Sequence, residues 1–140
     1  MTSPLGPVTH LTIHCTATPE GRDNSAAEVT RWDIERFGQP SYHFVVELDG
    51  TVVNTLPITQ KGAHTGGHNT GNIGVSYVGG TSSLNAGGVP KDTRTAEQKL
   101  ALRKIVAQMK AKYPGLIVLG HRDWPGVTKA CPSFDVRTSL

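Results

Sequence analysis

The spacing of hydrophobic and polar residues changes along the chain in a way that predicts alternating strands and helices. Residues 8–15 are rich in β-branched side chains, which favour a strand. Residues 42–54 hold two β-rich runs on either side of Asp49-Gly50, a two-residue turn sequence that predicts a hairpin. Further strands are predicted for residues 73–78 and 116–119, and the second of these is expected to be buried.

Alternation within the strands predicts which side chains share a face of the sheet. In the first strand, His14 and Cys15 point in opposite directions. If His14 faces a cleft, Cys15 faces away from it, so the two are not expected both to meet Cys131. Cys15 is therefore expected to be a small buried hydrophobe without a disulfide to Cys131. In the hairpin, one face is predicted to carry Tyr42, Phe44 and Val46, and the other His43, Val45 and Glu47.

Two helices are predicted from their start signals and apolar spacing. Ser25 and Glu28 match a capping box, and the helix that follows is expected to end at Gly38. Its apolar residues are expected to face the core, with Trp32 among them. A second helix is predicted to begin after Thr95. Its buried stripe is expected to consist of Leu102, Ile105, Val106, Met109 and Tyr113.

The order of these elements predicts the fold class. Strand, helix, hairpin, strand, helix and strand follow one another, which is typical of an α/β fold with helices packed on a mixed central β-sheet. A length of 140 residues predicts one domain over residues 1–140 with a single core. Loops rich in glycine are expected at residues 57–72 and 81–92.

Charge and hydropathy exclude some classes of function. The formal net charge of +3 is too small to argue for nucleic-acid binding, although it mildly favours approach to an anionic polymer. No apolar run is long enough to predict a membrane span. The first ten residues have neither a basic segment nor an apolar one of the kind found in signal peptides, so synthesis in the cytoplasm without a signal peptide is expected.

Candidate chemistry is concentrated in residues 120–135, GHRDWPGVTKACPSFD. Two prolines and a glycine interrupt this segment, which therefore predicts a loop. The imidazole of His121 and the thiolate of Cys131 are ligand types that zinc prefers, and His14 is the best candidate for a further ligand. Two histidines and one cysteine leave a fourth position for water, as in catalytic zinc sites. Spacing alone leaves open the alternative that these are ordinary loop residues.

Five segments taken together resemble a known family. The chain resembles the zinc-dependent N-acetylmuramoyl-L-alanine amidases of the amidase-2 type, which include bacteriophage amidase lysozymes and share their fold with the peptidoglycan-recognition proteins. The resemblance extends over residues 11–135, and its segments follow the order of the family. They are IHCTAT (13–18), SYHFVVELDGTV (41–52), GAHTGGHN (62–69), IGVSYVGG (73–80) and GHRDWPGVTKACPSFD (120–135).

The resemblance implies a zinc enzyme that acts on the bacterial cell wall. The implied reaction is hydrolysis of the amide bond between N-acetylmuramic acid and L-alanine in peptidoglycan, as in a phage endolysin released to the wall. The implied site residues are the Zn²⁺ ligands His14, His121 and Cys131, the catalytic Tyr42 and Lys129, and His64 in the substrate groove. A monomer is expected, with no separate wall-binding module and no nucleic-acid or membrane partner.

Two departures and two alternatives accompany this interpretation. Ser76 stands where some family members have a glutamate, so the metal, Tyr42 and Lys129 would carry the chemistry. Cys131 stands where other members use aspartate, which predicts sensitivity to oxidants and heavy metals. The alternatives are a recognition domain that binds muropeptide without cleaving it, and a cytosolic amidase that recycles wall fragments. The presence of all three implied ligands favours an enzyme.

Overall fold

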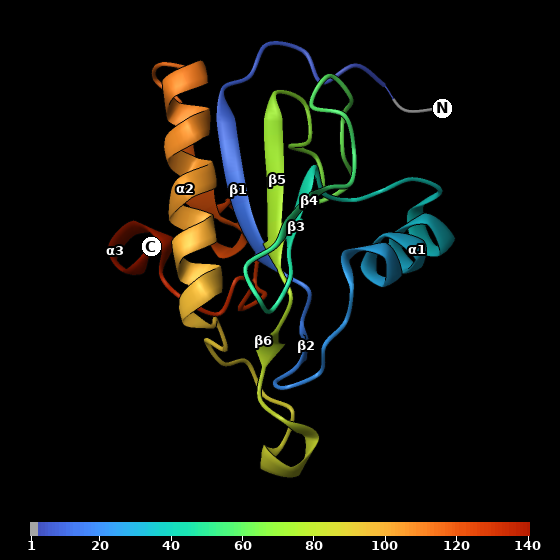
Figure 1. Ribbon diagram of the computed structural model, residues 1–140. Coiled ribbons are helices and arrows are strands. Elements are labelled where there is room, and N and C mark those ends of the chain that lie inside the picture. Colours follow the sequence, from blue (N-terminus) through green and yellow to red (C-terminus); the bar gives the residue numbers. More distant parts are fainter. Residues whose placement is uncertain (1–2) are drawn as a thin grey trace.

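The computed structural model describes residues 3–140 and has the predicted α/β architecture (Figure 1). Five strands form the main sheet in the order β4-β3-β5-β1-β7. Their bounds are His10–Cys15 for β1, Phe44–Val46 for β3, Val52–Asn54 for β4, Asn72–Tyr77 for β5 and Ile117–Gly120 for β7. Strand β1 is parallel to β5 and β7, and β3 is parallel to β5 but antiparallel to β4, so the sheet is mixed.

Shorter elements occupy the connections. Strands β2 (Thr18–Pro19) and β6 (Gly80–Thr81) pair in parallel as a second, two-stranded sheet. The predicted loops at 81–92 and 120–135 each contain one turn of 3₁₀ helix, and the chain closes with a short helix, α3. These elements are η1 (Leu84–Ala86), η2 (His121–Asp123) and α3 (Val136–Ser139). Among residues 3–140, the helices are all too short or too polar to cross a membrane.

The main hydrophobic core lies between the sheet and α2 (Ala96–Lys112). Leu11 and Ile13 of β1 face this core, as do Ile73 and Val75 of β5, and all four are 0% exposed. The predicted stripe of α2 is confirmed, since Leu102, Ile105, Val106 and Met109 are buried and Tyr113 is partly buried against them. Burial of this apolar surface is the main stabilising term of the fold.

On the opposite face of the sheet, β1 and β5 carry small and polar residues. Alternation along β1 places Thr12 and His14 on this face, and their partners in β5 are Gly74 and Ser76. Thr12, His14 and Ser76 are nevertheless buried. In Figure 1, α1 (Ala26–Phe37) lies on this side of the sheet and α2 on the other. One face therefore carries the main core, and the other carries polar groups on β1 and β5 beside a smaller apolar cluster that includes Val45.

Helix α1 begins and ends as predicted, but most of its apolar stripe is not in the core. Ser25 and Glu28 form the capping box, and Gly38 ends the helix with a positive φ of 77°. The two buried residues of the helix, Ala26 and Val29, both lie in its first half. The three large side chains of the second half remain exposed: Trp32 by 38%, Ile34 by 48% and Phe37 by 49%. The expected core position of Trp32 is therefore wrong, because apolar spacing cannot distinguish a core from an open groove.

Strand β7 also differs from the prediction. It was expected to be buried, but Ile117 is 49% exposed and only Gly120 is fully buried. The cause is its place in the sheet, since β7 pairs with β1 alone and forms one edge. A short apolar run predicts a strand, but its neighbours decide how deeply it is buried.

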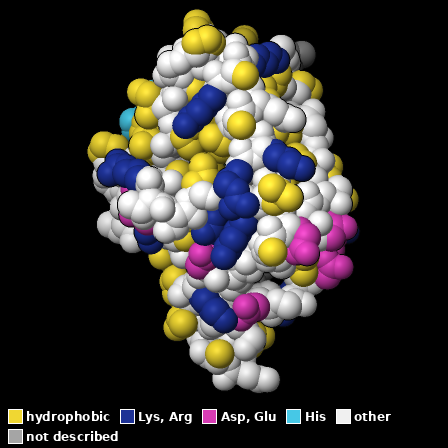
Figure 2. Space-filling model, turned by 60° about the vertical axis from the view of Figure 1, so that its left-hand side comes forward, with side chains coloured by type: hydrophobic (Ala, Val, Ile, Leu, Met, Phe, Trp, Pro, Cys, Tyr) yellow, Lys and Arg dark blue, Asp and Glu magenta, His cyan; other side chains and the backbone are white. Residues whose placement is uncertain are grey.

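The positive charge of the chain gathers on α2. Figure 2 shows lysine and arginine side chains clustered on the side of the molecule that α2 covers. The exposed cations of this helix are Lys99, Arg103, Lys104, Lys110 and Lys112, against one exposed acid, Glu97. This basic surface faces away from the polar face of the sheet.

Gln98 links α2 to the sheet, and its replacement tests how much that link stabilises the fold. Its side-chain amide donates to the carbonyls of Val78 (2.9 Å) and Val46 (3.3 Å), and the residue is 0% exposed. Gln98→Leu leaves both buried carbonyls without these partners and also removes the side-chain oxygen that accepts the N–H of Thr95 at the start of α2. We expect these losses together to lower the free energy of unfolding by about 2 kcal/mol. Urea denaturation measures the change, with Gln108→Leu on the exposed side of α2 as the matched control. An equal effect of both substitutions would contradict this role.

Candidate functional site

Three segments that are distant in sequence bring the predicted metal ligands together. His14 lies near the carboxyl end of β1, His121 follows β7 directly, and Cys131 lies in the loop after η2. Because β1 and β7 are parallel, their carboxyl ends meet at the same edge of the sheet. One ligand atom from each residue falls within 4.8 Å of the others, and the His14 and His121 ring centroids are 4.6 Å apart.

The histidines at this site are held in the form that binds metals. Burial lowers the pKa of His14 well below its ordinary value, and nearby His64, His121 and Lys129 lower it further. Burial and Lys129 also lower the pKa of His121. Imidazoles with lowered pKa values are neutral at pH 7, and a neutral ring nitrogen carries the lone pair that a metal requires.

Cys131 completes the cluster with a sulfur atom. Its Sγ is 3.8 Å from Nδ1 of His14 and accepts a hydrogen bond of 3.2 Å from the backbone N–H of Cys15. A hydrogen bond with the Cys15 side chain and burial raise the pKa of Cys131, and a bound metal ion would displace the thiol proton. The three donors, two neutral imidazoles and one thiolate, fit a zinc ion and leave a coordination position for water or substrate.

Cys15 agrees with the prediction in one respect and differs in another. It is buried at 6% exposure in the main core, and both cysteines are free, as expected. However, the inference that His14 and Cys15 cannot both meet Cys131 is wrong. The side chain of Cys15 lies on the opposite face of β1 from that of His14, but its side chain and its backbone N–H both form hydrogen bonds with Cys131. Alternation separates neighbouring side chains of one strand, and a loop residue at the end of that strand can still contact both.

Tyr42 lies beside His14, with 5.2 Å between the ring centroids. The prediction that Tyr42 shares a face of the sheet with Phe44 and Val46 is wrong. Strand β3 begins at Phe44, so alternation does not extend back to Tyr42, whose ring packs in a second cluster with Val45. Burial raises the pKa of Tyr42, and nearby Cys131 and Asp33 act in the same direction. The phenol therefore keeps its proton at neutral pH and can donate a hydrogen bond.

Two adjoining cavities open over these residues. One has a volume of about 310 Å³ and is lined by His14, Tyr42 and Cys131 together with Trp32 and Asp33 of α1. The other has a volume of about 560 Å³ and extends away from the cluster past Phe37. His64, His121 and the exposed Lys129 line both. The six predicted site residues thus surround one cleft.

Three other polar or aromatic side chains have structural partners. His43 is buried and bonds the backbone of Gln60 and Gly74 through its two ring nitrogens. The side chain of Asp123 accepts a hydrogen bond from the N–H of Gly120. Trp124 donates to the hydroxyl of Thr12 over 2.9 Å and stacks on His68 with 4.6 Å between centroids.

Sequence reasoning did not single out Asp33, a carboxyl group inside the cleft. It lies on α1 between Trp32 and Ile34 and lines the smaller cavity. Burial raises the pKa of Asp33 from 3.8 to about 6. In the sequence it is one of several acids on an amphipathic helix, and no motif marks it. Asp33 reaches the cleft because the second half of α1 borders it.

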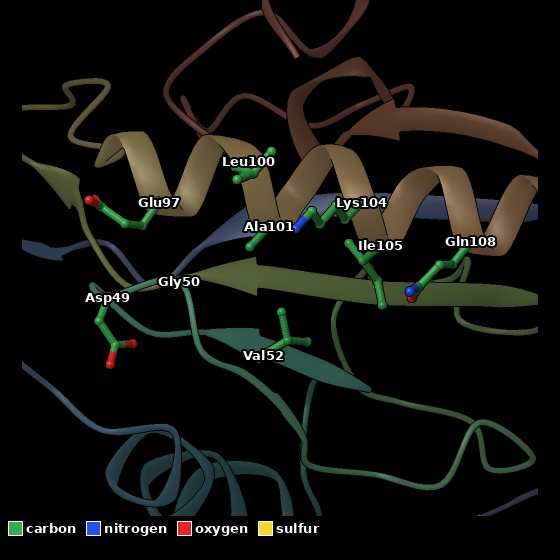
Figure 3. Close-up of a pocket in the computed structure, with 9 residues that line it drawn as sticks. All are labelled: Asp49, Gly50, Val52, Glu97, Leu100, Ala101, Lys104, Ile105 and Gln108. Atoms are coloured by element: carbon green, nitrogen blue, oxygen red, sulfur yellow. The ribbon is translucent and has the colours of Figure 1, made fainter.

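A further groove of about 380 Å³ lies on the other side of the sheet, between α2 and the β3–β4 hairpin (Figure 3). Val52, Leu100 and Ile105 supply its apolar lining, with Glu97 and Lys104 beside them. None of the predicted site residues lines it. The candidate chemistry is therefore confined to the cleft over the polar face.

Comparison with known proteins identifies relatives over nearly the whole chain. Residues 4–134 match the family model described as N-acetylmuramoyl-L-alanine amidase. The endolysin of Klebsiella phage KP32 is 35% identical over 126 residues, which cover 89% of this chain and 80% of that protein. The endolysin of Escherichia phage T7 is 32% identical over the same shares of the two chains.

Solved structures show the same fold at lower identity. The N-acetylmuramoyl-L-alanine amidase LysC from Clostridium intestinale URNW superposes with a TM-score of 0.78 at 20% identity, covering 96% of this chain and 83% of LysC. Peptidoglycan recognition protein-LE, solved in complex with tracheal cytotoxin, gives a TM-score of 0.72 at 23% identity, with 94% and 78% covered. Below 25% identity these likenesses establish the fold.

The raised pKa of Asp33 predicts a pH-dependent cost to stability. Between about pH 4 and pH 6 the folded chain binds more protons at this carboxyl group than the unfolded chain, so its contribution to stability falls as the pH rises through this range. Asp33→Asn removes the cost. We expect it to raise the free energy of unfolding by about 1 kcal/mol at pH 7.5, after allowance for solvent screening, and by much less at pH 4.

Urea denaturation of the wild type and Asp33→Asn at several pH values measures this effect. Glu35→Gln on the exposed side of the same helix controls for the loss of one negative charge. Parallel stability curves for the wild type and Asp33→Asn from pH 4 to 7.5 would contradict the assignment.

Proposed function

The chain belongs to the N-acetylmuramoyl-L-alanine amidase family, and from that premise we propose that it cleaves peptidoglycan with the help of a zinc ion. The bond cleaved is the amide between N-acetylmuramic acid and L-alanine. The observation that carries the proposal is the convergence of His14, His121 and Cys131 at the floor of a cleft. These three residues would hold the ion.

A zinc ion held there would supply Lewis-acid chemistry, namely polarisation of a carbonyl group and a lowered pKa, toward about 7, for the attacking water. The chain contributes the rest of the environment. Burial keeps His14 uncharged. Two adjoining cavities lie over the ligands and offer space for a substrate, while His14 itself is only 2% exposed.

Lys129 and Tyr42 are the proposed catalytic residues. Lys129 lines both cavities and lies two residues from Cys131, where its ammonium group can stabilise the negative charge that develops on the amide oxygen. Tyr42 keeps its proton and can donate a hydrogen bond to the same oxygen or orient the attacking water. Both side chains act from the wall of the cleft and neither is a metal ligand.

We further propose that the protein acts as an endolysin on the cell wall, with residues 1–140 as a single catalytic domain. The support is its similarity to phage endolysins, of whose length it covers 80%. The basic surface of α2 lies on the other side of the sheet from the cleft, so it can contact an anionic wall polymer without blocking the site. Function as a monomer stays a prediction.

The primary test joins metal analysis to product analysis on one purified sample. We expect one zinc ion per chain, and mass spectrometry of digested peptidoglycan should find new L-alanine amino termini. A chelator should abolish cleavage and added zinc should restore it. Stoichiometric zinc without cleavage would instead favour a recognition domain, and cleavage that persists without zinc would contradict the metal centre.

Cys131→Ser tests the metal centre directly. Losing the thiolate ligand should weaken zinc binding by more than the roughly 10- to 100-fold that follows loss of an outer partner, and amidase activity should fall with zinc content. Zinc affinity is measured by competition with a chromogenic chelator. Cys15→Ser, the same substitution at the other free thiol, is the control and should keep stoichiometric zinc. Full zinc affinity in Cys131→Ser would exclude Cys131 as a ligand.

Lys129→Ala separates catalysis from metal binding. We expect zinc content to be unchanged and kcat to fall by about 100-fold, because an oxyanion partner is lost. The control is Lys110→Ala, which removes the same charge from the basic surface of α2, and it should keep the wild-type rate on soluble muropeptide. An unchanged kcat in Lys129→Ala would show that Lys129 does not stabilise the oxyanion.

A further inference from the structure

His64 forms hydrogen bonds through both ring nitrogens inside the protein. Its Nδ1 lies 2.9 Å from Nε2 of His14 and 3.0 Å from the hydroxyl of Thr65. Its Nε2 lies 2.9 Å from the backbone carbonyl of Asn72. The residue is only 7% exposed, so it is not a surface histidine, but it still lines both cavities of the cleft.

These partners determine which nitrogen carries each proton. A carbonyl oxygen can only accept, so Nε2 of His64 must hold a hydrogen and donate it to Asn72. In a neutral imidazole, Nδ1 of His64 then has a lone pair and accepts from His14. Nε2 of His14 consequently carries the hydrogen, which leaves its Nδ1 with a lone pair. That Nδ1 is the atom 3.8 Å from the sulfur of Cys131.

Two glycines border the slot that holds the His64 ring. A Cβ atom added at Gly74 would lie 2.6 Å from Cδ2 of His64, and one added at Gly62 would lie 3.0 Å from the same atom and closer still to the backbone oxygen of Ser41. Neither glycine has a positive φ, so the backbone conformation does not require glycine at these positions. The imidazole therefore needs the space at Gly74, whereas Gly62 makes room for the backbone of Ser41 as well as for the ring. Gly74 is also the neighbour of Thr12 across the β1–β5 pairing, directly beside the strand that carries His14.

The backbone around His64 is fixed as firmly as the ring. The side-chain oxygen of Asn69 accepts the N–H groups of His64 (3.0 Å) and Thr65 (2.8 Å), which closes the loop on itself. Asn72, which receives the ring hydrogen, is the first residue of β5 and accepts the hydroxyl of Thr12 through its own side chain. A chain of hydrogen bonds therefore connects the backbone of β5 at Asn72 through His64 to His14.

We propose that His64 is a positioning residue for the metal centre. Its hydrogen bond fixes the tautomer and the orientation of His14, so that Nδ1 of His14 is free to bind the ion. Metal-binding histidines depend on such outer partners to orient the ring, and those partners commonly are carboxylates or backbone carbonyls. Here a second imidazole relays the bond from a backbone carbonyl. The proposal rests on the zinc site described under Proposed function. It adds a hydrogen bond to His14 to the groove-lining position that the sequence suggested, because His64 also lines both cavities.

The tautomer of His14 can be observed directly. Long-range ¹H–¹⁵N correlation spectra of the full chain distinguish a ring protonated at Nδ1 from one protonated at Nε2. We expect the hydrogen of His14, and that of His64, on Nε2 both in the zinc-loaded protein and after chelation. A hydrogen on Nδ1 of His14 in either state would overturn the proposal without the need for any variant.

A matched pair of substitutions measures the effect on metal binding. Asn and Leu have nearly the same shape, but the side-chain oxygen of Asn can take the place of Nδ1 as an acceptor for His14. We expect His64→Leu to weaken zinc binding about 10- to 100-fold and to leave His14 in mixed tautomers. His64→Asn should recover most of the affinity. A packing role alone would affect the two variants equally.

The outcomes separate this proposal from the zinc site on which it rests. His64→Leu with wild-type zinc affinity and an unchanged His14 tautomer would overturn the positioning role, and so would equal losses in His64→Leu and His64→Asn. Cys131→Ser should lose zinc while His14 keeps its hydrogen on Nε2, since the bond to His64 does not involve the sulfur. If Cys131→Ser instead kept full zinc affinity, the metal centre would be wrong while the tautomer result still stood.

Discussion

The placement of β1 between two parallel strands is the constraint on which the rest of the structure depends. Hydrogen bonds to β5 on one side and β7 on the other fix its register. With Leu11 and Ile13 committed to the core under α2, the intervening side chains must face the other way, and a shift by one residue would exchange the two faces. His14 is thereby held at the carboxyl edge of the sheet, next to His121, which directly follows β7.

This arrangement divides the molecule into a side for stability and a side for chemistry. The face under α2 is apolar and contains most of the buried hydrophobic side chains. The other face contains buried polar groups, which are costly unless they are hydrogen-bonded. Thr12 forms hydrogen bonds with Asn72 and Trp124, and His64 forms hydrogen bonds with Asn72 and His14. Such a network holds side chains in fixed positions, which a catalytic centre requires.

The cleft is built from residues that stability alone would not place there. Trp32 and Phe37 of α1 remain exposed at its border, and Asp33 is held between them at a raised pKa. Exposing large apolar side chains and burying a carboxyl group both cost stability, and such costs are typical of functional sites. The second half of α1 is accordingly best understood as a wall of the cleft rather than as part of the core.

Linear sequence patterns specify the local elements and the identity of the reactive groups. Capping residues set where α1 and α2 begin, Asp49-Gly50 set the hairpin, and the types of His14, His121 and Cys131 indicated zinc. These features depend on neighbouring residues or on intrinsic chemistry, so a linear pattern records them.

Three features of the site follow only from the folded arrangement: β7 is an edge strand, Tyr42 does not follow the alternation of β3, and Asp33 faces the cleft. The folded arrangement also decides that His64 bonds His14, because that contact joins positions 50 residues apart through a slot between β5 and a loop. Contacts of this kind depend on which surfaces meet after folding, and no local pattern encodes them.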